Sequence, residues 1–337
     1  MSLIVADVGG TNARLAFQKD KNSEINLIDN FLCANFKSLE DIVKTYKQKY
    51  NIFSENMSIA VAGPCDDENI KLSNNHIKFN KHQLLKNLNL KSLLTINDFV
   101  AQSFTFKDLL LNENKEKNNI LLDKLKLIEI KNGTSNINTT LLVTGPGTGL
   151  GVCYLKKIDN NVIPIPGEGG NAYFSPSNYE QIEILNYLLK SHKYVSFEDL
   201  VSGRGIENLF NFYRNRNNCP ISKIKAIEIA DLADNNDQNA VSAIKQMYKI
   251  LVTSIINNVF LNGSLAGVII CGGISIKLQN FLNQDIFIDE FLKIDPYFDY
   301  LNNIPIFLCK NECNGLIGAK DCFHDSYFKK SYMIYNR

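Results

Sequence analysis

Short apolar stretches alternate with longer amphipathic stretches along this chain. The apolar stretches have the length of buried strands and are bounded by turn residues. Residues 38–50 repeat apolar positions at helical spacing after Ser38, which can cap the helix with Asp41 three residues on. We predict strands within residues 3–8, 13–18, 24–35, 57–65, 92–97, 139–155 and 266–275, and helices within residues 38–50, 98–104, 177–192, 240–262 and 314–328. This alternation predicts an α/β protein with mixed sheets.

Two of these stretches share one layout of apolar strand, glycine-rich turn with threonine, and apolar strand. They read LIVADVGGTNARLAF at residues 3–17 and LLVTGPGTGLGVCYL at residues 141–155. The first turn is too short to hold a crossover helix, so its two strands should form a hairpin. Single glycine hairpins are common, but two of the same layout predict a duplicated fold with two symmetric phosphate-gripping turns.

The residue types of both turns suit phosphate binding. Glycine lets backbone N–H groups approach an anion closely, and threonine adds a hydroxyl donor. The candidate ligands are Gly9, Gly10, Thr11 and Asn12 in the first turn and Gly147, Thr148 and Gly149 in the second. The chain has neither a G-x-x-x-x-G-K-[ST] motif nor a G-x-G-x-x-G motif opening a helix after a strand. A Walker-type site and a dinucleotide fold are therefore not supported.

Asp7 ends the first strand, directly before the first of these turns. A carboxylate beside a phosphate repels it unless a divalent cation lies between them, and Mg²⁺ takes carboxylate oxygens, often through water. On this turn alone, a turn-capping aspartate accounts for Asp7 equally well.

Two further acids lie where an α/β protein assembles its site. Asp98 follows the strand at residues 92–97, and a carboxylate at a strand end can accept a proton from a substrate hydroxyl. Glu168 lies in PIPGEGGNAYF, where glycines and prolines hold it in a rigid loop. Together with the amides of Asn97 and Asn171, such carboxylates match sugar hydroxyls, which both donate and accept hydrogen bonds. A turn acid without a ligand remains the alternative for Glu168.

Composition narrows the class of protein further. A length of 337 residues fits two domains better than one, and a hydrophobic content of 45% supplies a buried core. The net charge of +1 gives no argument for nucleic acid or for an anionic membrane surface. No apolar stretch is long enough to span a bilayer, and no basic segment precedes the run from Leu3. We therefore expect neither a membrane span nor a signal peptide.

The cysteines show no pattern of a metal site, and one segment of the chain is unusually polar. The eight cysteines include no C-x-x-C pair, which favours reduced thiols in a cytoplasmic protein. Three of them and a histidine are close in sequence, but their spacing fits no common zinc pattern; they are Cys309, Cys313, Cys322 and His324. Residues 112–138 are rich in asparagine and lysine, and we predict that they are the most loop-like part of the first half.

With these residues in view, the chain resembles the bacterial-type glucokinases of the hexokinase–actin–Hsp70 ATPase superfamily over nearly its whole length. The matching motifs, in chain order, are DVGGTNARLAF, INDF, GPGTGLG, PGEGG, VIICGGIS and CNGLIGA. The resemblance implies a duplicated ribonuclease-H-like (actin-like ATPase) fold, with two domains and a cleft between them. The smaller α/β domain would contain residues 1–110 and 312–337, and the larger one residues 111–311.

The activity implied by the resemblance is phosphorylation of glucose at O6 by ATP with Mg²⁺, giving glucose 6-phosphate at the start of glycolysis. Asp98 would be the base that takes the O6 proton. The residues that would hold the sugar hydroxyls are Asn97, Asp98, Glu168 and Glu198. The residues that would meet the nucleotide are Gly10, Thr11, Gly147 and Thr148 at the phosphates, with Asp7 near the metal, and Gly272 and Gly273 under the adenosine. The resemblance also implies that the protein is often a homodimer.

The chain departs from the family pattern in three places. Asn171 stands where the family usually has a sugar-binding histidine after GEGG. The segment SNNHIKF has Ile77 where tryptophan is usual, and the stretch between INDF and GPGTGLG is longer than usual. Only the first departure bears on sugar choice, and we predict that Asn171 still faces the sugar.

Three other functions compete with glucose phosphorylation. A kinase for another hexose or an amino sugar, such as mannose, fructose or an N-acetylated hexosamine, remains open. A sugar-responsive regulator is less expected, because such proteins carry a DNA-binding domain before the first phosphate strand. Here that strand begins at Leu3, and the net charge is near neutral. A glycosidase using Asp98 and Glu168 as its acid pair leaves the two glycine turns unexplained.

Overall fold

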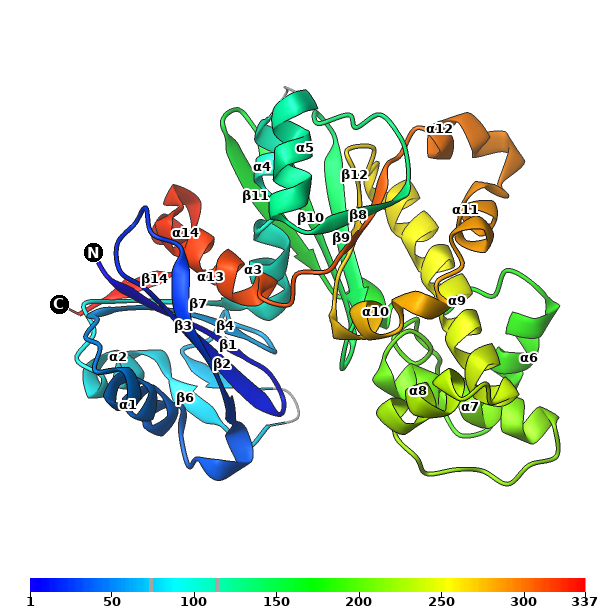
Figure 1. Cartoon of the computed structure of the whole chain (residues 1–337), viewed down its shortest axis with the longest axis horizontal. Helices are drawn as coiled ribbons and strands as arrows, with labels where there is room; N and C mark the ends of the chain where they lie inside the picture. Colours follow the sequence, from blue (N-terminus) through cyan, green and yellow to red (C-terminus); the bar gives the residue numbers. More distant parts are fainter. Residues whose placement is uncertain (73–74, 113–114, 337) are drawn as a thin grey trace. The chain divides into compact units, whose positions relative to one another are not determined.

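The computed structural model describes residues 1–72, 75–112 and 115–336, and the chain divides into two compact units (Figure 1). Unit 1 comprises Met1–Asp108 and Glu312–Arg337, and unit 2 comprises Leu109–Asn311. Within the described residues, each unit is built on one six-stranded mixed sheet. The α/β class predicted from the alternation of strands and helices is therefore confirmed.

The sheet of unit 1 has the strand order β14-β7-β4-β1-β2-β3. Its strands are β1 (Leu3–Val8), β2 (Asn12–Gln18), β3 (Ile25–Leu32), β4 (Asn56–Val61), β7 (Ser92–Asn97) and β14 (Met333–Tyr335). Strands β1, β4 and β7 run parallel, while β2, β3 and β14 join by antiparallel pairing. Two short strands, β5 (Asn69–Lys71) and β6 (Lys78–Asn80), form a separate antiparallel ribbon.

Helices cover both faces of this sheet (Figure 1). On one face lie α1 (Leu39–Tyr50) and α2 (Lys81–Asn87), whose apolar residues pack into a common core with the strands. On the other face, α13 (Asn314–His324) packs on β1, β4 and α3 (Asp98–Phe104). The 3-10 turn η1 (Cys33–Asn35) precedes α1, and α14 (Ser326–Ser331) leads into β14.

The sheet of unit 2 has the order β11-β10-β9-β12-β13-β8. Its strands are β8 (Leu127–Lys131), β9 (Thr140–Pro146), β10 (Leu150–Ile158), β11 (Asn161–Gly167), β12 (Gly267–Ile270) and β13 (Ile306–Cys309). Its helices are α4 (Asp108–Leu111), α5 (Lys115–Lys124), α6 (Tyr179–Leu188), α7 (Gly203–Arg216), α8 (Ala226–Asp234), α9 (Gln238–Asn262), α10 (Gly273–Lys277), α11 (Gln284–Leu292) and α12 (Phe298–Asn302), with 3-10 turns η2 (Gly169–Asn171), η3 (Gln279–Phe281) and η4 (Asp295–Tyr297).

The two sheets repeat one pattern of strand directions. In each, a glycine hairpin (β1–β2 or β9–β10) extends antiparallel into a third strand, β3 or β11. On its other side, the first strand of each hairpin pairs with a parallel strand, β4 or β12. That strand pairs with a second parallel strand, β7 or β13, and an antiparallel strand, β14 or β8, forms the edge of the sheet. This repetition is the duplication that the two similar glycine stretches predicted.

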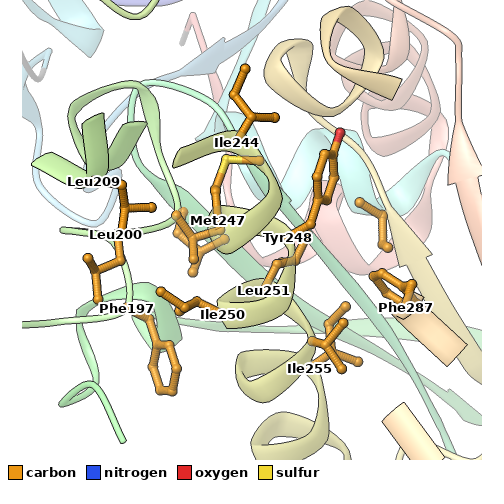
Figure 2. Packing of buried hydrophobic residues seen from close by; sticks show 14 of the residues in the cluster. Phe197, Leu200, Leu209, Ile244, Met247, Tyr248, Ile250, Leu251, Ile255 and Phe287 are labelled. Atoms are coloured by element: carbon orange, nitrogen blue, oxygen red, sulfur yellow. The ribbon is translucent and has the colours of Figure 1, made fainter. Parts of the chain in front are cut away.

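Helix α9 forms the centre of the core in unit 2 (Figure 2). Its residues Met247, Leu251 and Ile255 are fully buried. The helix begins after Asp237, whose carboxylate accepts from the Ala240 N–H, and its C-cap is Gly263, whose φ of +58° favours glycine. Helix α9 also contacts β9, the strand that leads into the second glycine stretch.

Local signals in the sequence agree with the structure, with one exception. The Ser38 side chain accepts a hydrogen bond from the Asp41 N–H, so the predicted N-cap is confirmed. The prediction that residues 112–138 are loop-like is wrong, because they contain α5 and β8. Strand β8 is stabilised by antiparallel pairing with β13, a partner distant in sequence. Of the segment SNNHIKF, Ser73 and Asn74 lie outside the described residues.

Among the residues described, no helix is long and apolar enough to cross a membrane.

Candidate functional site

In unit 1 the candidate residues gather where parallel strands end. The register aligns Val8 of β1 with Val61 of β4, and Val61 with Asn97 of β7. Asp7, the first glycine turn (Gly9–Asn12) and the pair Asn97–Asp98 therefore lie at the same edge of one sheet. This edge is where α/β proteins assemble binding sites.

Asn97 and Asp98 are held by the start of α3. Asn97 caps this helix, its side-chain oxygen accepting from the N–H groups of Phe99 at 2.9 Å and Val100 at 3.1 Å. Its amide nitrogen donates to the Gly63 carbonyl at 3.3 Å. Asp98 is the first residue of α3, and its Oδ1 accepts from the Phe99 N–H at 2.9 Å. The carboxylate of Asp98 therefore stands beside the N–H groups at the start of α3.

Asp7 faces Arg14 across the β1–β2 hairpin. Burial raises the pKa of the Asp7 carboxyl to about 6, and the Arg14 guanidinium offsets part of that rise. Helix α13 approaches closely, since a Cβ added to Gly315 would lie 2.4 Å from Asp7 Oδ2. Arg14 is itself held, because its Nη1 donates to the Glu312 carbonyl.

Backbone hydrogen bonds shape the first glycine turn. The Gly9 N–H donates to the Asn12 carbonyl at 2.9 Å and closes the turn. The Thr11 carbonyl accepts from the Cys33 N–H, also at 2.9 Å. The sequence did not single out Asn75, whose amide donates to the Gly9 carbonyl at 2.9 Å. Gly10 lies within the same turn, between these fixed points.

In unit 2, the second glycine turn (Gly147–Gly149) lies against the loop between β12 and α10. The Gly147 N–H donates to the Gly149 carbonyl at 2.7 Å, and Thr148 is exposed at the tip. Gly272 has a φ of +100°, and a Cβ there would lie 2.5 Å from the Pro146 carbonyl oxygen. Only glycine allows this approach, which brings Gly272 and Gly273 beside the turn.

The loop of residues 166–171, which contains Glu168, packs on the start of β10. A Cβ added to Gly170 would lie 2.2 Å from the Leu150 carbonyl oxygen. The exposed Asn171 amide donates to Glu168 Oε2 at 3.3 Å. Glu198 joins this group, because its N–H donates to the Gly170 carbonyl at 2.8 Å. Unit 2 thus brings Glu168, Asn171 and Glu198 together with the second glycine turn.

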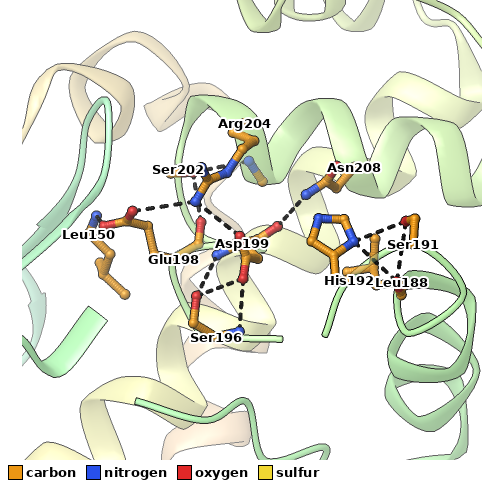
Figure 3. A network of polar contacts seen from close by, with 11 residues as sticks. Leu150, Leu188, Ser191, His192, Ser196, Glu198, Asp199, Ser202, Arg204 and Asn208 are labelled. Atoms are coloured by element: carbon orange, nitrogen blue, oxygen red, sulfur yellow. Dashed lines mark hydrogen bonds and ion pairs between the residues drawn. The ribbon is translucent and has the colours of Figure 1, made fainter. Parts of the chain in front are cut away.

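Glu198 belongs to a polar network that the sequence did not predict (Figure 3). Arg204 Nη2 lies 2.9 Å from Asp199 Oδ1 and 3.4 Å from Glu198 Oε1. An arginine in the first turn of a helix, shortly after two acids, was the only signal in the sequence that pointed to this contact.

The cysteine–histidine group near the C-terminus has other contacts. His324 Nε2 and Gln18 Oε1 are 2.8 Å apart, and burial with neighbouring lysines lowers the pKa of His324 to about 4. All eight cysteines lie within the described ranges, and none of them forms a disulfide bond. Across residues 1–72, 75–112 and 115–336, no group of three or more histidine, cysteine or acidic side chains is arranged to hold a metal.

Known structures share this architecture. A glucokinase from an Antarctic psychrotroph aligns with a TM-score of 0.79 at 27% identity, covering 96% of this chain and 99% of that chain. A ROK family glucokinase from Streptomyces griseus, in complex with glucose and AMPPNP, aligns with a TM-score of 0.62 at 16% identity, covering 95% and 98%. The fold is that of sugar kinases of the actin-like ATPase type.

Sequence comparison gives the particular family. The glucokinase family profile matches residues 4–326. A glucokinase from Colwellia psychrerythraea is 32% identical over 325 residues, which cover 94% of each chain. The chain therefore belongs to the glucokinase family. It is a hexose kinase that uses ATP to make glucose 6-phosphate.

Proposed function

We propose that the edge of the unit 1 sheet and the loops of unit 2 supply the residues for phosphoryl transfer from ATP to O6 of glucose. The observation that supports this most directly is the position of Asp98. Its carboxylate follows β7 beside the capping amide of Asn97, at the same edge as the first glycine turn. A base for the sugar hydroxyl and a cradle for phosphate are the two parts this reaction needs.

Asp98 acts as the general base. As O6 attacks the γ-phosphorus of ATP, the O6 proton passes to the Asp98 carboxylate. The bond between the γ-phosphorus and the bridging oxygen breaks, and ADP leaves. Phosphoryl transfer asks little covalent chemistry of a protein, so positioning and charge stabilisation provide most of the acceleration.

Carboxylates and amides from both units bind the sugar. Asn97 and Asp98 come from unit 1, and Glu168, Asn171 and Glu198 from unit 2. Each sugar hydroxyl can donate to a carboxylate and accept from an amide. Asn171 takes the place of the family's histidine near the O1–O2 side of the ring, where it is shorter and stays uncharged.

The two glycine turns bind the phosphates of ATP, and Gly272 and Gly273 lie under the adenosine. The surroundings of these glycines fit such a ligand. A Cβ added to Gly147 or Gly273 would have no protein atom closer than 4.0 Å, so the backbone there faces space that a ligand can fill. The residues of the first turn in this role are Gly9, Gly10, Thr11 and Asn12.

Asp7 is the residue that would hold Mg²⁺, through water. The chemistry of its position fits, because a buried carboxylate oxygen is the hard ligand that Mg²⁺ prefers. When bound, the ion would neutralise negative charge on the phosphate oxygens of ATP. Asp7 and Arg14 then set the local charge around the first glycine turn.

Three features implied by the family resemblance also belong to this proposal. We propose that residues 1–110 with 312–337 and residues 111–311 act as two domains with a cleft between them. We propose a homodimer, which size-exclusion chromatography with light scattering can test. We propose a cytoplasmic location, where ATP is available and the cysteine thiols stay reduced.

A sugar panel in a coupled ADP-release assay tests the proposed function. Glucose should give the highest kcat/KM, ahead of mannose, fructose and N-acetylglucosamine. A clear preference for one of the other sugars would identify that sugar, and not glucose, as the substrate. ADP release independent of sugar would contradict the assignment of the sugar-binding residues.

A further inference from the structure

Arg204 lies at the N-terminal end of α7, where the helix dipole alone disfavours a positive charge. It lies in the first turn of α7, after the N-cap Ser202, whose Oγ accepts from the Gly205 N–H at 3.0 Å. The N-terminal end of a helix carries partial positive charge, so a cation in this turn is unfavourable. The two carboxylates within reach, Glu198 and Asp199, offset that cost.

Asp199 fixes the guanidinium. Its Oδ2 accepts from the Ser196 N–H at 2.9 Å and from the Ser196 hydroxyl at 2.8 Å, and its side chain is 10% exposed. Its Oδ1 then lies 2.9 Å from Arg204 Nη2. Because Asp199 is held by Ser196 and largely buried, the arginine that it binds has a defined direction (Figure 3).

Glu198 receives the other contact of Arg204. Oε1 lies 3.4 Å from Arg204 Nη2, while Oε2 accepts from the Leu150 N–H at 2.9 Å. The backbone of Glu198 is anchored as well, since its carbonyl accepts from the Ser202 hydroxyl at 2.7 Å. Both carboxylate oxygens are thus oriented, and each retains lone-pair directions for a further donor.

We propose that Arg204 is a positioning residue for sugar binding, which holds the charged Glu198 carboxylate in the orientation that receives a sugar hydroxyl. This inference rests on the proposed role of Glu198. Without Arg204, the carboxylate keeps only the Leu150 contact and gains freedom of rotation. The sugar must then order it on binding, and affinity for the sugar falls while the phosphate turn keeps its geometry.

Arg216 provides a matched control at the other end of the same helix. It also pairs with two carboxylates, Glu180 at 3.0 Å and Glu183 at 3.9 Å. Its side chain is 51% exposed, against 58% for Arg204. Arg204→Gln should raise the glucose Kd about two- to tenfold by calorimetry. Arg204→Gln should have the same KM for ATP and the same thermal midpoint of unfolding as Arg216→Gln. Arg204→Lys should restore part of the affinity for glucose.

A double-mutant cycle separates this inference from the proposed function. Glu198→Gln should weaken glucose binding by itself, and adding Arg204→Gln should then change the Kd by less than about twofold. If Glu198→Gln weakens binding and Arg204→Gln does not, the role of Arg204 is overturned while that of Glu198 stands. If Glu198→Gln has no effect, the proposed sugar site is wrong and the inference falls with it. The role of Arg204 would also be overturned if Glu198→Gln and Arg204→Gln had additive effects on the glucose Kd. Equal losses of ATP and glucose affinity in Arg204→Gln would overturn it as well.

Discussion

The Glu198 carboxylate accepts a hydrogen bond at 2.9 Å from the backbone N–H of Leu150. Leu150 directly follows the second glycine turn, and Glu198 is one of the proposed sugar ligands. A proposed sugar ligand therefore contacts the residue next to the turn that we propose binds phosphate. Substitutions that displace the Glu198 carboxylate should therefore weaken sugar binding. Substitutions of an exposed side chain in the turn should instead weaken ATP binding.

Gly149→Ala should weaken sugar binding. A Cβ at this position would lie 2.4 Å from Glu198 Oε2, so the carboxylate must move away from its place. We expect the KM for glucose to rise at least threefold, about the value of one neutral hydrogen bond. Gly147→Ala is the control, since its Cβ would meet no protein atom closer than 4.0 Å and should leave glucose affinity unchanged. Glucose binding of wild-type strength in Gly149→Ala would show that Glu198 does not hold the sugar.

Thr148→Val should weaken ATP binding with little change for the sugar. The Thr148 side chain is exposed at the tip of the second glycine turn, so the substitution should not disturb the core. A hydrogen bond to a charged group contributes about 1.5–3 kcal/mol, which corresponds to an increase in the KM for ATP of about tenfold or more. Steady-state kinetics with each substrate varied will measure this. An effect confined to the sugar would mean that the turn has been misassigned.

Asn171 should contribute to sugar choice. Its amide donates to Glu168 Oε2 at 3.3 Å, so Asn171→Ala removes a proposed sugar contact and also loosens Glu168. We expect the KM for glucose to rise about three- to tenfold in Asn171→Ala, with turnover largely kept. Asn171→His should tighten glucose binding and discriminate better against mannose and 2-deoxyglucose. Unchanged KM values for all three sugars in Asn171→Ala would remove Asn171 from the site.

Activity should require a divalent cation. Asp7 beside the first glycine turn is the basis for this expectation, because the phosphates and the carboxylate repel each other without one. EDTA should abolish turnover, added Mg²⁺ should restore it, and elemental analysis should find no stoichiometric zinc. Full activity in EDTA would contradict the role given to Asp7.

The features that the sequence predicted are those fixed by neighbouring residues. The hairpin around Gly9 and Gly10 follows from a tight turn between apolar strands, and the cap at Ser38 from a hydroxyl three residues before Asp41. Strand β8 was missed, because its pairing with β13 depends on residues far along the chain. The contact of Arg204 with Glu198 was missed for a similar reason, since it requires α7 to begin at Gly203. The roles of the site residues in catalysis stay predictions.

Replacement of Asp98 by asparagine tests whether this carboxylate is the base that accepts the O6 proton. Asp98→Asn keeps the shape of the side chain but removes the base, so kcat should fall by about 10²–10⁴. Glucose and ATP affinities, measured by calorimetry, should stay close to wild type. Asp108→Asn is the matched control, because Asp108 is an exposed aspartate at the start of the neighbouring helix α4. Glucose 6-phosphate formation should be lost in Asp98→Asn and kept in Asp108→Asn. A wild-type kcat in Asp98→Asn would mean that Asp98 is not the base.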